Sequence, residues 1–202
     1  MAQGDVYHWH LRDLVRAEGC YRHILADYRD TARPDTLRKA LYRVGEIYRW
    51  RGDGAKTREF FERAQRIPTN NLTAAQSKVR PGYLARAIED YIRSDQMGDA
   101  YTLLTQWAWE YPTDMLEGYW SSLRIQWLLK NKEYPGGIEE AETLLKLNPQ
   151  STYAVRVLML AADCAEALKE PDRARKLLQR ALVDYPESPE RAAVQERLAP
   201  KK

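Results

Sequence analysis

The sequence predicts an all-α protein, an α-solenoid of stacked antiparallel helical hairpins with about ten helices. Three observations lead to this prediction. Apolar residues recur at helical spacing, prolines and glycines divide the chain at regular intervals, and one block of residues occurs twice. No segment alternates apolar and polar residues over the length of a strand, which excludes a sheet as the main element.

Apolar positions recur every three or four residues along most of the chain, as in Leu37, Leu41, Val44 and Ile47. The same spacing predicts ten helices, over residues 6–28, 36–51, 55–67, 80–95, 97–110, 115–131, 136–147, 152–168, 171–184 and 189–199. The first is either one long helix or a helix broken at Gly19. The last has a narrow apolar stripe and is expected to cap the stack.

Prolines mark the ends of four of these helices, because proline cannot continue the backbone hydrogen-bond ladder. They are Pro68, Pro112, Pro149 and Pro186. Ser188 followed by Pro189 is a favourable pair for the cap and first turn of the last helix.

A block of the sequence recurs at a fixed distance, which is the sign of a repeat architecture. Leu84, Ala87, Leu104 and Tyr111 are each followed 74 positions later by Leu158, Ala161, Leu178 and Tyr185. This distance corresponds to two units of about 37 residues each. A hairpin of this size cannot bury its apolar face alone, so neighbouring hairpins must stack.

Residues 41–69 resemble the tetratricopeptide repeat (TPR), with Leu41, Val44-Gly45, Tyr48, Gly52-Asp53, Phe61, Ala64 and Pro68 at the characteristic positions. The resemblance implies a right-handed superhelix and one TPR-like domain over residues 1–202. Its parts would be a partial hairpin 1–31, hairpins 36–69, 80–114, 115–151 and 152–188, and a cap helix 189–199. The chain is most similar to bacterial repeats of the outer-membrane assembly lipoprotein and Tol-Pal coordinator type. Arg124 stands where the family usually has glycine.

Composition sets limits on location and partners. The net charge of +3 is too small to indicate nucleic-acid binding. No apolar run is long enough for a membrane span, so direct membrane insertion is not expected. No secretion signal is visible, which predicts a cytoplasmic location, or a periplasmic one if a signal was removed.

The residues that could carry chemistry do not form a recognisable catalytic or metal set. The stretch Arg51–Thr57 looks like a phosphate loop or an adhesion triplet, but Trp50 and Ala55 stand where a phosphate loop needs glycines. His8 and His10 point in different directions on a helix, so a metal site is not expected. Cys20 and Cys164 are buried thiols or, alternatively, a disulfide. The prediction is therefore no enzyme, no cofactor and no metal.

The resemblance implies that the first helix of each hairpin lines a concave groove. The groove residues predicted by register are Lys39, Tyr42, Glu46, Arg49, Trp50, Glu89, Arg93, Ser121, Ile125, Arg156, Met159, Asp163 and Glu166. The Lys/Asn/Arg set with which chaperone-binding relatives clamp a peptide carboxylate is replaced here, for instance by Tyr42 and Glu46. The recurring acids Glu46, Glu89 and Asp163 favour a basic or amide-rich ligand, unless neighbouring arginines neutralise them.

These patterns predict a non-catalytic scaffold that holds a segment of another protein, with Trp50 and Tyr42 as anchors. The groove could also be empty or occupied by the protein's own terminus. The alternative is a structural spacer or self-association region of a larger bacterial envelope or regulatory protein. In that case a homodimer through the N-terminal helix is expected, because residues 11–28 carry an unpaired apolar face.

Overall fold

The computed structural model describes residues 1–67 and 74–199, and within these ranges all regular structure is helical. The elements are α1 (Ala2–Asp5), the π-helical turn η1 (Val6–His10), α2 (Leu14–Asp27), α3 (Pro34–Arg51), α4 (Gly54–Gln65), α5 (Ala74–Arg93), α6 (Met97–Glu110), the 3-10 turn η2 (Pro112–Leu116), α7 (Tyr119–Lys130), α8 (Tyr134–Leu147), α9 (Ala154–Ala167), α10 (Pro171–Asp184) and α11 (Arg191–Leu198). The predicted all-α class is confirmed.

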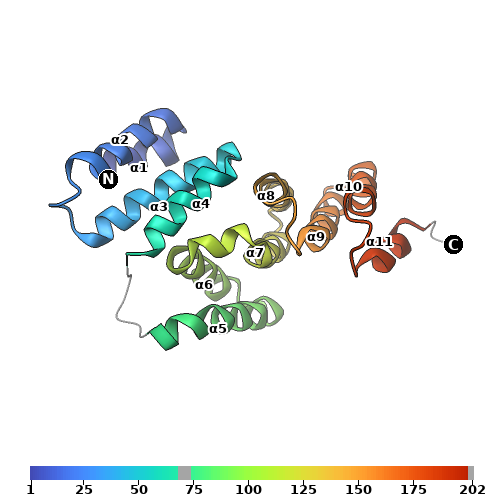
Figure 1. Cartoon of the computed structure of the whole chain (residues 1–202). Coiled ribbons are helices and arrows are strands. Elements are labelled where there is room, and N and C mark those ends of the chain that lie inside the picture. The colour runs from blue at the N-terminus through green and yellow to red at the C-terminus, as the bar shows by residue number, and fades with distance from the viewer. Residues whose placement is uncertain (68–73, 200–202) are drawn as a thin grey trace.

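Consecutive helices pair into hairpins, as the repeat predicts (Figure 1). Four hairpins are full: α3–α4, α5–α6, α7–α8 and α9–α10. In the first, partial hairpin, α1 and η1 fold back on α2. Both predictions for this segment are wrong, because the chain breaks at residues 11–13, where Arg12 has φ +51°, and Gly19 lies inside α2. At the other end, α11 packs on α10.

The turns inside the hairpins share one backbone geometry. Each first element ends at a residue in the left-handed region: Arg12, Gly52, Asp95, Lys132 and Lys169, with φ between +51° and +75°. The amide of the residue after Gly52 bonds back to the carbonyl of Tyr48 at 3.0 Å, as in a Schellman cap. Only Gly52 is a glycine, which is why the other turns do not stand out in the sequence.

Prolines end the second helices as predicted. α6, α8 and α10 stop before Pro112, Pro149 and Pro186, and the preceding residue leaves the helical region in each case, with ψ between 61° and 79°. Pro68 lies outside the described residues. Ser188 does not begin the last helix, which starts only at Arg191.

α5 is longer than predicted. It begins at Ala74 rather than at residue 80 and contains Pro81. The proline costs one backbone hydrogen bond, but the helix continues through it. The turn η2 between α6 and α7 was not predicted, and it proves important for how the hairpins are arranged.

The buried side chains form two cores of different character. The N-terminal core contains seven buried aromatic residues, among them Tyr21, Tyr42, Phe61 and Trp107. The C-terminal core, from Ile125 onward, consists of aliphatic residues, alanines and Cys164. Close helix approach depends on glycine in both: a Cβ at Gly45 would lie 2.5 Å from the Phe61 ring, which is shorter than any van der Waals contact.

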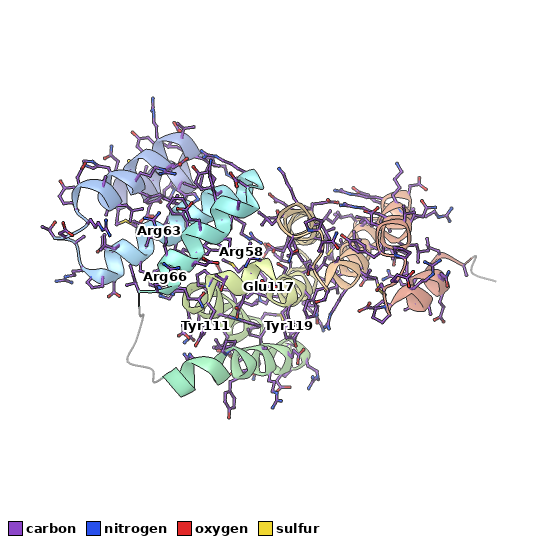
Figure 2. The ribbon with its side chains drawn as sticks, in the orientation of Figure 1. Arg58, Arg63, Arg66, Tyr111, Glu117 and Tyr119 are labelled. Atoms are coloured by element: carbon purple, nitrogen blue, oxygen red, sulfur yellow. The ribbon has the colours of Figure 1, made fainter. Side chains whose placement is uncertain are left out.

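The α3–α4 hairpin departs from a regular stack. In a solenoid, each repeat contacts only its neighbours. Here α4 packs on η2, and α3 reaches α8 of the next-but-one hairpin. The Arg58 guanidinium of α4 lies 3.6 Å from the carboxylate of Glu117, just beyond η2. Both residues are labelled in Figure 2. At the far end of α3, the Lys146 ammonium donates to the Arg51 carbonyl at 3.1 Å.

Arg38 holds this arrangement from inside. Its side chain is 1% exposed. One terminal nitrogen donates to the carbonyls of Ala64 and Ile67 at the end of α4, and the other to those of Trp109 (2.6 Å) and Glu110 (3.0 Å) at the end of α6. A cation suits both sites because unpaired carbonyls give helix C-termini a partial negative charge. Arg38 therefore links the α3–α4 hairpin to the α5–α6 hairpin, at the C-terminal ends of α4 and α6.

Candidate functional site

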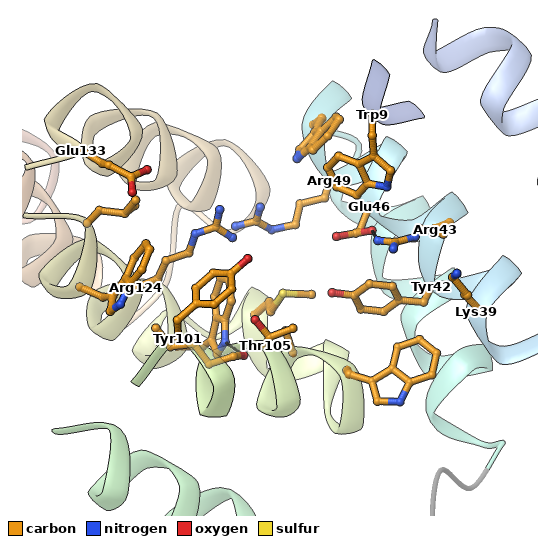
Figure 3. A pocket seen from close by; sticks show the side chains of 18 residues that line it. Trp9, Lys39, Tyr42, Arg43, Glu46, Arg49, Tyr101, Thr105, Arg124 and Glu133 are labelled. Carbon is orange, nitrogen blue, oxygen red and sulfur yellow. Dashed lines mark hydrogen bonds and ion pairs between the residues drawn. The ribbon is translucent and has the colours of Figure 1, made fainter. Parts of the chain in front are cut away.

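A cavity of about 750 Å³ lies where the α3–α4 hairpin meets α6 and α7. Its size is within the range of ligand-binding pockets. α3 forms one wall, α6 and α7 form the floor and the opposite wall, and Trp9 from η1 and Met115 from η2 complete it (Figure 3). The cavity exists because the α3–α4 hairpin bends over α6 onto α8.

Tryptophans are concentrated in this cavity. Five of the six in the chain line it: Trp9, Trp50, Trp109, Trp120 and Trp127. Two of them fix the floor, since the indole of Trp120 donates to the Leu104 carbonyl at 3.0 Å and that of Trp127 to the Met97 carbonyl at 2.8 Å. These bonds attach α7 to α6.

The rim of the cavity is aromatic and exposed. Trp9 and Trp50 are each 44% exposed, with ring centroids 5.6 Å apart, and Tyr101 across the cavity is 55% exposed. His8 stacks beneath Trp9 at 4.4 Å and is itself buried. Large aromatic side chains left in solvent are unfavourable in isolation and are common at binding surfaces.

A buried ionic cluster closes the cavity at the α3–α8 contact. The Arg49 guanidinium pairs with Glu140 of α8, whose carboxylate also accepts from the Ser121 hydroxyl at 2.7 Å. Arg124 of α7 approaches the same carboxylate at 3.6 Å. In Figure 3 the guanidinium groups of Arg49 and Arg124 point toward each other across the cavity. Arg124, where the sequence resemblance predicts glycine, thus supplies a cation to the site.

A second cluster lies on α3. Arg43 donates to Glu46 at 2.6 Å and approaches Asp5 of α1 at 3.6 Å, and Lys39 lies 3.2 Å from the other Asp5 oxygen. Burial raises the pKa of Glu46 above its ordinary value, although Arg43 beside it acts in the opposite direction. The predicted residues Lys39, Tyr42, Glu46, Arg49 and Trp50 therefore all line one cavity.

The predicted groove residues of the middle hairpins do not line it. Ser121 and Ile125 are fully buried, so the expectation that they face a partner is wrong. Ile125 instead packs near Gly137 of α8. Glu89 accepts from the Tyr119 hydroxyl at 2.6 Å, and exposed Arg93 pairs with Asp90 on its own helix.

The predicted groove residues of α9 face other parts of the protein. Arg197 of the capping helix α11 pairs with Asp163 at 2.6 Å and Glu166 at 3.2 Å, and donates to the Met159 carbonyl. Arg156 lies over the Tyr119 ring at 5.9 Å. The capping helix α11 therefore pairs with Asp163 and Glu166, the acidic residues that the repeat register had placed in the ligand groove.

Sequence reasoning missed most of the residues that α6 and α7 contribute. Register assigns second helices such as α6 to the outer surface, and on the first helix α7 it selects a different face. The missed residues are Tyr101, Leu104, Thr105, Ala108, Trp109, Trp120, Arg124 and Trp127. Two signals were available: the high number of tryptophans, and Arg124 in place of the usual glycine.

The described residues show no sign of a metal site or a membrane span. They contain no group of three or more His, Cys, Asp and Glu side chains able to hold a metal ion. None of the helices among them is both long and apolar enough to cross a bilayer. Cys20 and Cys164 are both free, so the alternative of a disulfide is wrong.

The stacked hairpins define an α-helical repeat protein. Residues 128–198, from the end of α7 through α11, match the model of the tetratricopeptide repeat family. Among solved structures it is similar to the "TPR2AB-domain:pHSP90-complex of yeast Sti1", with a TM-score of 0.49 and 17% identity, over 94% of this chain and 80% of that chain. The search of curated proteins gave no match.

Proposed function

We propose that the chain is a non-catalytic scaffold that binds a segment of another protein in the aromatic cavity. The observation that supports this most is the gathering of five tryptophans from η1, α3, α6 and α7 around one open space. Tetratricopeptide domains generally mediate protein–protein interactions. The placement of such scaffolds in a bacterial envelope remains a prediction from the sequence.

A peptide fits this cavity better than a compact small molecule. The floor is formed by buried side chains such as Leu104, Trp120 and Leu128, whereas the rim has exposed aromatics at both ends, with Trp50 at one and Tyr101 at the other. A segment lying across the cavity would cover both ends of the rim, and aromatic anchors of this kind supply most of the binding energy in many interfaces.

The test uses random dodecapeptides displayed on phage, selected against the full chain. A selected peptide is then titrated into the ¹⁵N-labelled protein while the indole N–H signals are followed. The signals of the five cavity tryptophans should shift, and that of Trp107, which donates to Asp114 outside the cavity, should not. Failure to select any peptide that shifts the cavity signals would overturn the proposal.

Substitutions give a second readout. Trp50→Ala should weaken peptide binding at least about fivefold, because truncating an interface tryptophan commonly costs more than 1 kcal/mol. Tyr83→Ala is the matched control, an aromatic residue 70% exposed on α5 and outside the cavity. Tyr42→Ala is a poor choice, because Tyr42 is 9% exposed and packs on Phe61 and Trp109.

Self-association through the N-terminal hairpin is the second candidate function. Val6, Leu11 and Val15 are 47%, 61% and 75% exposed on this hairpin, whereas Ala17 and Tyr21 face inward. A second copy would cover these apolar side chains. Light scattering should then show a dimer that the Leu11→Ser, Val15→Ser double variant loses, and a monomer at all concentrations would exclude this candidate.

A further inference from the structure

We propose that the cavity selects segments with an acidic side chain placed between apolar or aromatic ones. This inference rests on the proposed function, since it names the chemistry of the segment that the same cavity would bind. It reverses the expectation of a basic ligand that the recurring acids suggested.

The reversal follows from where those acids are used. Glu46 is paired with Arg43, Glu89 with the Tyr119 hydroxyl, and Asp163 with Arg197 of the capping helix. Arginines thus balance the charges of Glu46 and Asp163, and neither Glu89 nor Asp163 lines the cavity. The recurring acids therefore leave little negative potential in the cavity for a basic segment.

The cations of the cavity outnumber the carboxylates that contact them. Lys39, Arg43, Arg49 and Arg124 line the cavity, and the carboxylates in contact with them are Asp5, Glu46 and Glu140. Glu133 also lines the cavity, but it lies at the end opposite Glu46 (Figure 3). Among the described residues, these four cations thus share three carboxylates, which gives the part of the cavity near α3 and α7 a net positive charge.

The guanidinium groups also have unused donors. The Nε atoms of Arg43 and Arg49 are buried and have no hydrogen-bond partner among the described residues, although that of Arg43 lies 3.6 Å from Asp5. A buried donor without an acceptor is unfavourable, and a charged one more so. An incoming carboxylate would compete with Glu46 and Glu140 for these arginines and would supply the acceptors that are missing.

The aromatic rings of the cavity also favour an acidic segment over a basic one. Arginines of the protein already lie over Trp9 (Arg43, 5.0 Å) and Trp120 (Arg124, 5.2 Å; Arg49, 5.7 Å). A cationic ligand would have to displace them to make cation–π contacts. Among the described residues no cation lies over Trp50 or Trp127, so these two indoles are available to apolar neighbours of the acid.

The test starts from the same phage selection, restricted to peptides that shift the cavity indole signals. We expect these peptides to be enriched in Asp or Glu flanked by aromatic or aliphatic residues. Replacing the peptide acid by its amide should weaken binding at least about tenfold, because charge-assisted hydrogen bonds are about twice as strong as neutral ones. This comparison leaves the protein unchanged, so folding cannot confuse it.

A protein variant gives the converse test. Arg124→Gln should weaken binding of the acidic peptide about fivefold or more and binding of its amide version little. The reason is that the positive charge of Arg124 attracts the carboxylate and not the uncharged amide. Arg93→Gln is the matched control, the same change on an exposed arginine outside the cavity.

The outcomes separate the two proposals. Cavity-binding peptides that are basic or uncharged, or that bind equally well as amides, would overturn the acid preference and leave the scaffold function standing. If no peptide shifts the cavity indoles, the proposed function fails and the acid preference fails with it.

Discussion

The two halves of the molecule solve the same packing problem in different ways. From α7 to α11 the hairpins stack directly, with α8 on α9 and α7 on α9, over an aliphatic core. The α3–α4 hairpin instead packs on η2 and α8, over a core rich in aromatic residues. The family model matches the first region, and the cavity lies at the edge of the second.

This difference in packing explains where the cavity lies. Small side chains such as Ala161, Ala162 and Ala165 allow helices to approach closely, which leaves little room between them. Where the α3–α4 hairpin leaves the regular stack, large aromatic rings and arginines fill the wider space incompletely. The cavity is the space that remains.

The largest effect on stability is expected at Arg38, which lies on α3 in the irregular region. Arg38→Met should lower the free energy of unfolding by about 3–5 kcal/mol, because buried carbonyls at two helix ends lose their charged donor. Arg173→Ala, an exposed arginine of α10 paired with Glu170, should change it by less than about 0.5 kcal/mol. Urea denaturation measures both, and equal effects would show that Arg38 does not join the hairpins.

Acid should destabilise the N-terminal region first. Burial and nearby Arg43 lower the pKa of His8 from 6.5 to about 4, while Asp5 acts the other way. A depressed folded-state pKa gives stability that is complete above pH 6.5 and is lost as the pH falls toward 4. The loss should approach about 3 kcal/mol at pH 4.

The variant His8→Phe should remove most of this pH dependence. All three histidines lie in residues 1–23. As the pH falls from 6.5 to 4, the amide protection factors should therefore decrease in α2 and α3 before they decrease in α9 and α10. The same pH dependence in His8→Phe would assign the effect to other groups.

Neighbouring glycines test the close packing of the regular region. A Cβ at Gly137 would lie 2.6 Å from the Cys164 sulfur, whereas one at Gly136 would make an ordinary contact at 3.5 Å with Leu128. Gly137→Ala should therefore lower the free energy of unfolding by about 1–2 kcal/mol. Gly136→Ala should leave it unchanged or raise it by about 0.5 kcal/mol. Thermal melting distinguishes them.

The sequence predicted what depends on local rules. Helical spacing, the pre-proline helix ends at Tyr111, Asn148 and Tyr185, and the Gly52 turn all follow from the residues nearby. Tyr48 and Phe61, which the sequence places at characteristic repeat positions, are buried.

The parts of the site that were missed depend on contacts between distant elements. Arg49 meets Glu140 across 91 positions, and Arg38 meets Trp109 across 71. Repeat register places a residue on a face of its own hairpin, so it could place Trp50 and Tyr42 on α3. It cannot show that this hairpin bends over α6, which is what brings Trp109 and Tyr101 into the cavity.

The cavity exists only if α3 closes onto α8. Whether α3 does so can be measured at the contact between Arg49 and Glu140. A double-mutant cycle with Arg49→Met and Glu140→Gln should give a coupling free energy of at least about 1 kcal/mol in urea denaturation. The exposed pair Arg93–Asp90, treated the same way, should give less than about 0.5 kcal/mol. A coupling near zero for Arg49 and Glu140 would contradict the closed arrangement and remove one wall of the proposed binding site.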